Sequence, residues 1–120
     1  MAGKIVADTL EHSTAGSVTT DYVVNGSAKA WMGNWSFSTN SSGDSFNIAS
    51  NTDNGTGDVT STFSSNMNNA NFSGGAIDNN FTHLKSNSQT SSTFRTQSHN
   101  TSYAGYDVTR LHHTVNGDLA

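Results

Sequence analysis

The segment from Phe46 to Phe63 constrains the fold most, because it has the pattern of a β-hairpin. Apolar and polar residues alternate on both sides of Asn54-Gly55. An Asn-Gly pair between alternating segments favours a type I′ turn, in which both central residues take a positive φ. The pattern therefore predicts two antiparallel strands whose bulky side chains share one face. The predicted register pairs Phe46 with Phe63, Ile48 with Ser61 and Ser50 with Val59.

Further short strands are expected from Ala28 onward. The spacing of Trp31, Trp35 and Phe37 predicts one strand that buries all three side chains on one face. Other strands are expected over residues 72–77, 81–85, 93–97 and 106–115. Short strands separated by turn residues are typical of all-β domains. We therefore expect a short antiparallel β-sandwich or jelly-roll-like domain over residues 28–120.

Residues 1–27 contain too few apolar residues to fold alone, and we expect them to form an extended N-terminal arm. Asn25-Gly26 predicts a turn near the end of this arm. The apolar side chains of the arm are expected to contact a partner surface and not the domain itself. The residues expected to make this contact are Ile5, Val6, Leu10, Tyr22 and Val23.

The chain is poor in the residues that usually form a core. Leu, Ile, Val and Phe together number 20 of 120 residues, whereas Ser, Thr and Asn number 50. A domain of this size buries only about two thirds of the surface that its unfolded chain exposes. We therefore expect a homotrimer in which one sheet face is buried between copies. The residues expected in the core or in oligomer contacts are Trp31, Trp35, Phe37, Phe46, Ile48, Val59, Phe63 and Phe94.

Composition also argues against several classes of function. Five Lys and Arg residues are too few for a nucleic-acid-binding surface, because such a surface must neutralise phosphates. The chain contains no cysteine, which excludes thiol chemistry and zinc–thiolate sites. No apolar run is long enough to span a bilayer. We find no hydrolase nucleophile motif, and Glu11 is the only Glu, so we expect neither an enzyme nor a cofactor.

His112-His113 is the pattern closest to a metal-binding motif. Neighbouring residues of a strand point to opposite faces, so the two rings cannot bind the same ion within one chain. We expect two ordinary strand residues and no metal. The alternative is a metal site on the axis of a trimer, where one of these histidines meets its symmetry copies.

Five segments occur in order along residues 1–115: Asn25–Trp31, Asp44–Ser50, Thr52–Asp58, Asn69–Phe72 and Ser92–Arg95. Together they resemble a family of small tail-fibre-like virion proteins of marine bacteriophages. The resemblance implies a short N-terminal arm that leads into a compact β-sandwich, assembled as a trimer in the virion. His112-His113 departs from the family pattern, which has a uniformly apolar closing strand at this position.

The resemblance and the composition together predict a bacteriophage virion structural protein. The expected form is a homotrimeric tail fibre or receptor-binding tip, and the alternative is a capsid decoration, cement or head-fibre protein. A carbohydrate-binding module is the alternative of another class, but Trp31 and Trp35 are expected to be buried, whereas sugar binding needs exposed aromatic rings. Expected partners are further copies, other tail or capsid proteins and host-surface glycan, without nucleic acid or membrane insertion. The expected location is the virion, assembled in the host cytoplasm and released by lysis.

Overall fold

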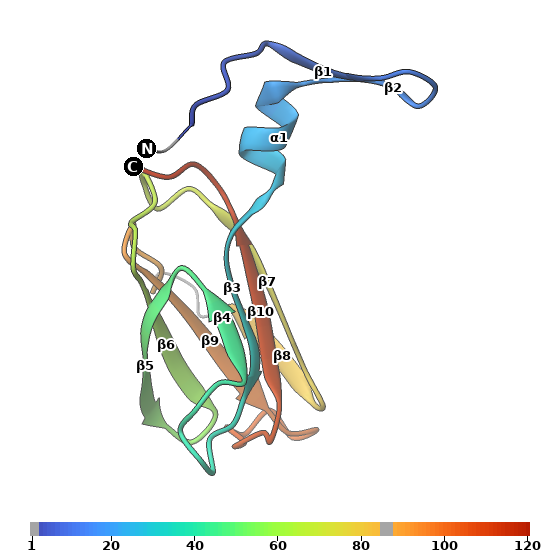
Figure 1. Cartoon of the computed structure of the whole chain (residues 1–120). Coiled ribbons are helices and arrows are strands. Elements are labelled where there is room, and N and C mark those ends of the chain that lie inside the picture. Colours follow the sequence, from blue (N-terminus) through green and yellow to red (C-terminus); the bar gives the residue numbers. More distant parts are fainter. Residues whose placement is uncertain (1–2, 85–87) are drawn as a thin grey trace.

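Figure 1 shows the computed structural model, which describes residues 3–84 and 88–120. Two four-stranded antiparallel sheets pack face to face, so the predicted all-β antiparallel sandwich is confirmed. Sheet I has the strand order β4 (Asp44–Phe46), β3 (Ala28–Trp35), β10 (Leu111–Asn116) and β7 (Ser73–Asp78). Sheet II has the order β5 (Ile48–Gly55), β6 (Asp58–Phe63), β9 (Thr93–His99) and β8 (Phe81–Leu84). The strand predicted over residues 81–85 corresponds to β8, and its predicted last residue, Lys85, lies outside the described residues.

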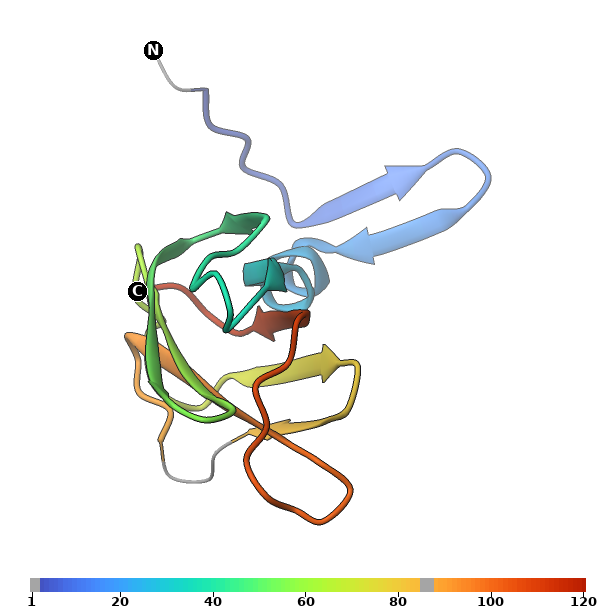
Figure 2. The ribbon, with the colours of Figure 1, turned by 90° about the horizontal axis from the view of Figure 1, so that it is seen from below.

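The N-terminal arm, residues 3–27, projects from one end of the sandwich (Figures 1 and 2). It consists of a hairpin, β1 (Thr9–His12) and β2 (Gly16–Thr19), followed by the short helix α1 (Thr20–Gly26). The predicted turn at Asn25-Gly26 is wrong, because both residues belong to the end of α1. Glycine is common at the end of a helix as well as in a turn, so the local pattern did not distinguish the two.

Asn47 separates two strands that the sequence pattern joins into one. Its φ is 56°, in the left-handed region, and the chain passes there from sheet I to sheet II. Phe46 therefore pairs with Trp31 in sheet I, whereas Ile48 pairs with Phe63 in sheet II. The predicted pairing of Phe46 with Phe63 is wrong, because alternation predicts a shared face only while the backbone stays extended.

The Asn47 side chain holds this crossing in place. Its amide nitrogen donates to the carbonyl oxygens of Lys29 and Ser65, both at 3.0 Å, and its amide oxygen accepts from the Ser65 N–H at 2.6 Å. Asn is among the few residues that tolerate a left-handed conformation. The side chain of Asn47 thus connects β3 of sheet I to the segment that follows β6 of sheet II.

The hairpin of β5 and β6 is present, but its turn lies two residues beyond Asn54-Gly55. Gly55 pairs with Asp58, so the connecting residues are Thr56 and Gly57, and Asn54 does not take a positive φ. Gly57 has φ 72°, and a Cβ there would lie 2.4 Å from the Ser98 carbonyl oxygen. The segment around Ser98 thus packs so closely against the turn that only glycine fits at position 57. No local sequence pattern predicts this packing.

The predicted register of this hairpin is also wrong along β5. Register shifts between Ile48 and Ser50, and between Asp53 and Gly55, move the pairing partners. The observed pairs place Asn51 opposite Ser61 and Asp53 opposite Val59. Such bulges add a residue to one strand and so change which side chains lie opposite each other.

Asn34 changes the facing of side chains along β3. Its φ is 54°, and the pairing of β10 with β3 shifts at the same level. Met32 and Trp35 consequently both point into the core, although they are three residues apart. Trp31 instead lies on the outer face of sheet I, so the prediction that it shares a face with Trp35 is wrong.

The core lies between the two sheets and is closed within one chain. Twelve hydrophobic side chains of the described residues are buried, in two adjoining clusters. One cluster contains Ala30, Phe63, Met67, Phe72, Phe94 and Val115, and the other contains Met32, Trp35, Phe37, Val59, Val108 and Leu111. The argument that the core must be shared between copies is therefore wrong, and the homotrimer stays a prediction.

Candidate functional site

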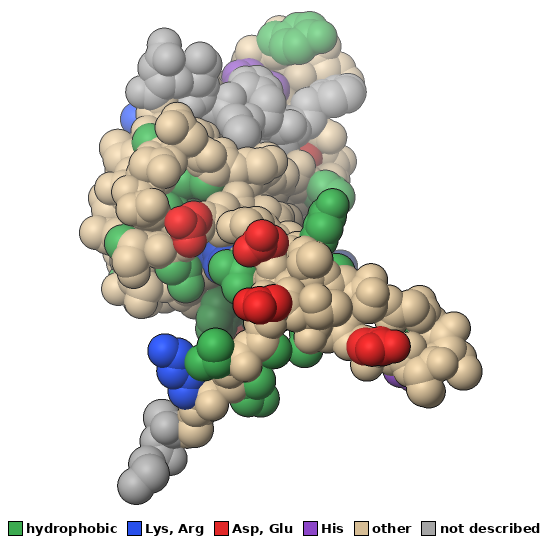
Figure 3. Space-filling view, turned by 90° about the horizontal axis from the view of Figure 1, so that it is seen from above, with side chains coloured by type: hydrophobic (Ala, Val, Ile, Leu, Met, Phe, Trp, Pro, Cys, Tyr) green, Lys and Arg blue, Asp and Glu red, His purple; other side chains and the backbone are tan. Residues whose placement is uncertain are grey.

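The arm surrounds an open apolar hollow of about 470 Å³. Ile5 and Val6 on its rim are 91% and 81% exposed. The view from above shows hydrophobic side chains gathered along the arm (Figure 3). Contiguous exposed apolar side chains on a soluble protein mark interaction sites. The apolar side chains that line the hollow are Ile5, Val6, Ala7, Leu10, Val23 and Val24.

Hydrogen bonds from Thr20 give the hollow its shape. The Thr20 hydroxyl donates to the Ala7 carbonyl oxygen at 2.8 Å, and the Thr20 N–H donates to the Asp8 carbonyl oxygen at 2.9 Å. These bonds hold the start of helix α1 against the chain that enters β1. The aliphatic residues before β1 and those in α1 therefore line the same hollow.

Lys29 and Asn116 join the arm to the sandwich. The Lys29 ammonium is buried and donates to the carbonyl oxygens of Val24 and Ser27, the latter at 2.9 Å. The Asn116 side-chain amide donates to the Gly26 carbonyl oxygen at 2.9 Å. Backbone carbonyl groups at the end of a helix lack partners within the helix, so these bonds satisfy them.

The outer face of sheet I carries a row of side chains that crosses all four strands. Phe46 pairs with Trp31, Trp31 with Thr114, and Thr114 with Gly75. Phe46 is 53% exposed and Trp31 is half-buried. On β7, Ile77 is 74% exposed on the same face. This surface, which we call the aromatic face, combines aromatic and aliphatic groups with positions that carry no side chain.

The aromatic face contains a hollow of about 200 Å³ between β7 and β10. It is lined by Gly75, Ala76 and Ile77 of β7 and by the segment from His112 to Thr114 of β10. A Cβ at Gly75 would meet no described atom within 4 Å, so the missing side chain leaves open space at this position. The sequence pattern predicted a strand over residues 72–77 but did not identify this surface.

His112 and His113 lie on opposite faces of β10, His112 exposed and His113 buried. The His112 Nδ1 atom accepts the Asn34 N–H at 3.4 Å. His113 packs against Phe94 with ring centroids 5.0 Å apart, and its two nitrogen atoms have no hydrogen-bond partner among the described residues. Burial in this apolar environment lowers the pKa of His113 from 6.5 to about 4.

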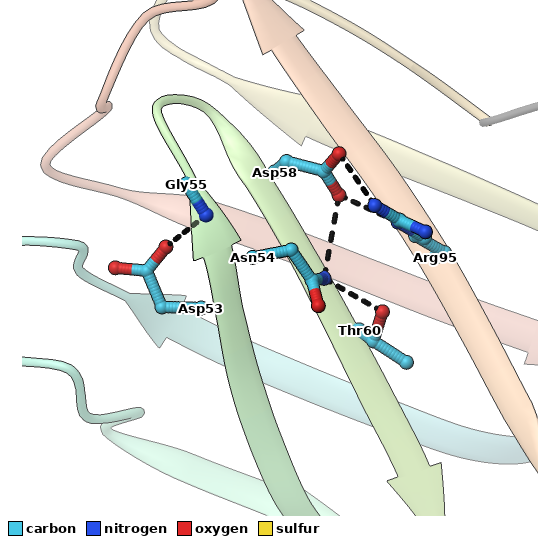
Figure 4. Close-up of polar contacts among 6 residues, drawn as sticks. All are labelled: Asp53, Asn54, Gly55, Asp58, Thr60 and Arg95. Atoms are coloured by element: carbon cyan, nitrogen blue, oxygen red, sulfur yellow. Dashed lines mark hydrogen bonds and ion pairs between the residues drawn. The ribbon is translucent and has the colours of Figure 1, made fainter.

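The outer face of sheet II carries a network of polar side chains that includes one ion pair (Figure 4). The Arg95 guanidinium donates to both carboxylate oxygens of Asp58, at 2.7 and 2.9 Å. This hydrogen bonding raises the pKa of Arg95. The Asn54 side-chain amide donates to the Thr60 hydroxyl at 2.8 Å and to Asp58 at 3.4 Å. Asn54 therefore belongs to a network of side chains on this face, not to the turn.

The structure distributes the remaining predicted site residues between two environments. Ile48 is half-buried and packs against both core clusters. The buried residues are Trp35, Phe37, Val59, Phe63 and Phe94. The predicted arm residues are exposed, namely Ile5, Val6, Leu10, Tyr22 and Val23. Val24, which the sequence reading did not include, lines the arm hollow beside Val23.

Within the part of the chain that the structure describes, no three His, Cys, Asp or Glu side chains are grouped so as to hold a metal ion. None of the described helices has the length and apolar character needed to cross a membrane. A scan of protein-family models, a search of curated proteins and a search of solved structures each found no match to this chain.

Proposed function

We propose that this chain is a bacteriophage virion structural protein that its N-terminal arm attaches to the particle. The observation that carries the proposal is the arm hollow, where Ile5 and Val6 are almost fully exposed on a segment that projects from a closed domain. Burying apolar area contributes about 25 cal/mol per Å², so the hollow favours a partner surface that covers it. The family resemblance supports a virion as the assembly that supplies this partner.

The proposed form is a homotrimeric tail fibre or receptor-binding tip, with the sandwich directed outward. A capsid decoration, cement or head-fibre protein is the alternative, in which the arm lies across capsid subunits. The assembly would take place in the host cytoplasm, and lysis would release it. A density map of intact particles separates the two forms, because a tail component is present in few copies and a decoration protein in many.

The attachment is tested with full-length variants in which the arm hollow is made charged. We expect Val6→Asp and Val23→Asp to leave the sandwich folded but to reduce the amount of the protein in purified particles by at least about tenfold, since a buried unpaired carboxylate costs several kcal/mol. Val18→Asp is the matched control, because Val18 lies in the arm hairpin but does not line the hollow. Equal incorporation of all three variants contradicts the proposal.

The trimer is tested separately, by light scattering of the purified protein. A stable monomer at micromolar concentration would contradict the trimer and leave the arm attachment standing.

A further inference from the structure

We propose that the aromatic face of sheet I binds a neutral saccharide, with Trp31 and Phe46 as the stacking surface and the hollow over Gly75 as the seat of one sugar ring. The inference deepens the proposed function by naming a ligand class and a site for contact with a host surface, and it rests on that function only for the source of the saccharide. It also reverses the sequence argument against sugar binding, which placed Trp31 in the core.

The two aromatic side chains lie side by side across neighbouring strands. Trp31 and Phe46 are directly paired between β3 and β4, and both lie on the outer face. The face of an aromatic ring carries partial negative charge. The C–H groups on one side of a pyranose ring carry partial positive charge and form an apolar surface, so a sugar ring stacks on such a platform.

Gly75, the outward-facing glycine of β7, leaves the hollow open to a ligand. Gly75 lies in the same cross-strand row as Trp31, with Thr114 between them. Because no described atom lies within 4 Å of where its Cβ would be, the backbone itself forms the floor of the hollow. Glycine inside a strand weakens the strand and often marks a position where another group approaches the backbone closely.

Polar groups at the edge of the hollow match the hydroxyl groups of a sugar. Because the His112 Nδ1 atom accepts the Asn34 N–H, the neutral ring carries its proton on Nε2, which is then a donor. The exposed hydroxyl of Thr114 both donates and accepts. Binding sites for small ligands typically combine an apolar lining with a few placed polar groups of this kind.

The charge on the aromatic face favours an uncharged ligand. Among the described side chains of its four strands, the outward-facing charged residues are Asp44, at one end of β4, and Lys29. The Lys29 ammonium already donates to the carbonyl oxygens of Val24 and Ser27 at the end of α1. Among the described residues, no Lys or Arg lines the hollow, whereas a sulfated or acidic sugar would need such a cation as a partner.

The size of the face argues against a second copy of the chain as its occupant. Four strands about 4.8 Å apart and about six residues long present roughly 400 Å². A stable protein–protein interface buries about 800 Å² on each partner. The face is therefore too small to hold two copies together by itself, but it is large enough for two or three sugar rings.

The purified full-length protein provides the test. We expect it to bind at least one neutral hexose or N-acetylhexosamine oligomer on an array that contains maltohexaose, cellohexaose, mannohexaose and chitohexaose beside acidic oligosaccharides. Calorimetric titration with the bound neutral oligomer then gives the affinity of each variant. Gly75→Val should abolish binding without lowering the melting temperature, because Val occupies the hollow, its Cβ meets no described atom within 4 Å, and Val favours a strand.

Trp31→Ala should weaken binding roughly thirtyfold, as expected when a central aromatic contact is removed. Phe46→Ala tests the same platform where Trp31→Ala lowers the yield of folded protein, since Phe46 is more exposed. Tyr103→Ala is the control, because Tyr103 is an 85% exposed aromatic residue in the β9–β10 connection and not on the aromatic face. It should bind with unchanged affinity.

Three results overturn the inference: binding of acidic oligosaccharides alone or of none on the array, unchanged affinity in Gly75→Val, or a change of oligomeric mass in Gly75→Val. The last result would assign the face to a second copy. None of these results bears on the arm, whose charged variants report incorporation into particles. A failed attachment test likewise leaves the binding titration valid.

Discussion

The two outer faces of the sandwich are both formed by antiparallel strands, but one carries polar side chains that bond to each other and the other carries exposed apolar side chains. On sheet II, Arg95 donates to Asp58, and the Asn54 amide donates to both Asp58 and Thr60, so these polar groups find their partners on the face itself. On sheet I, Trp31 and Phe46 lie in the same cross-strand row as Gly75, and apolar area is left exposed. A face whose groups are satisfied internally contributes to stability, whereas an open apolar face is available to a ligand.

This difference depends on which side of each strand a residue occupies. The chain offers four pairs of like residues in which one member points inward or belongs to the sheet II network and the other lies exposed on the aromatic face. Each pair gives a prediction in which the two substitutions differ in their effect on stability or on its pH dependence.

The largest effect is expected for the two phenylalanines that the sequence pattern placed opposite each other. Phe63→Ala should lower the free energy of unfolding by about 3–5 kcal/mol, because Phe63 is buried and packs edge-on against Phe72. Phe46→Ala should cost less than about 1 kcal/mol, because Phe46 is largely exposed. Chemical denaturation of both variants measures the difference. Similar losses would place Phe46 in the core and remove it from the aromatic face.

The two histidines should differ in their effect on pH dependence. The pKa of His113 is about 4 in the folded protein and 6.5 as an ordinary value, so the unfolded chain binds the proton first as pH falls. The contribution of His113 to stability is therefore complete above pH 6.5 and is lost as pH falls to about 4, by about 3 kcal/mol in total.

Denaturation curves between pH 7 and pH 4 test this contribution. The variant His113→Leu should lose that part of the pH dependence, whereas His112→Ala should keep it. A His113→Leu variant with the same pH dependence as the unaltered protein contradicts the burial of that ring.

The adjacent glycines of β7 should respond oppositely to the same substitution. A Cβ at Gly74 would lie 2.4 Å from the Phe94 ring, so Gly74→Val should destabilise by about 1–3 kcal/mol through overpacking. Gly75→Val should leave stability unchanged or raise it slightly, because no described atom lies within 4 Å of its Cβ. Melting temperatures of the two variants report the order, and a reversed order would mean that β7 faces the other way.

The smallest effect is expected for the carboxylates. Asp58→Asn should cost about 1–2 kcal/mol, because it breaks a two-bond pair whose Arg95 partner remains partly solvated. Asp44→Asn should change stability by less than about 0.5 kcal/mol, since Asp44 is exposed and accepts only from the neighbouring Ser45 N–H. Salt should reduce the first effect little, and equal effects would contradict the assignment of the paired network to sheet II.

The sequence alone determined the fold class and much of the core. Short alternating segments separated by turn residues predicted an antiparallel sandwich, and Val59 and Phe63 were correctly placed on one face of a strand. The sequence also predicted an N-terminal arm apart from the sandwich, because residues 1–27 contain too few apolar residues to fold alone. These predictions depend only on the composition and the spacing of side chains along the chain, which the sequence gives directly.

Only the tertiary structure decided which outer face is open. Asn34 and Asn47 take left-handed backbone conformations, and each reverses the facing of the residues that follow it. Asn tolerates that conformation but does not require it, so the sequence does not reveal which of its 15 Asn residues will adopt it. Their conformations follow from contacts with distant segments, such as the bonds from Asn47 to Lys29 and Ser65. For that reason Trp31 and Phe46 came to lie together on the surface, where spacing alone had placed them in the core.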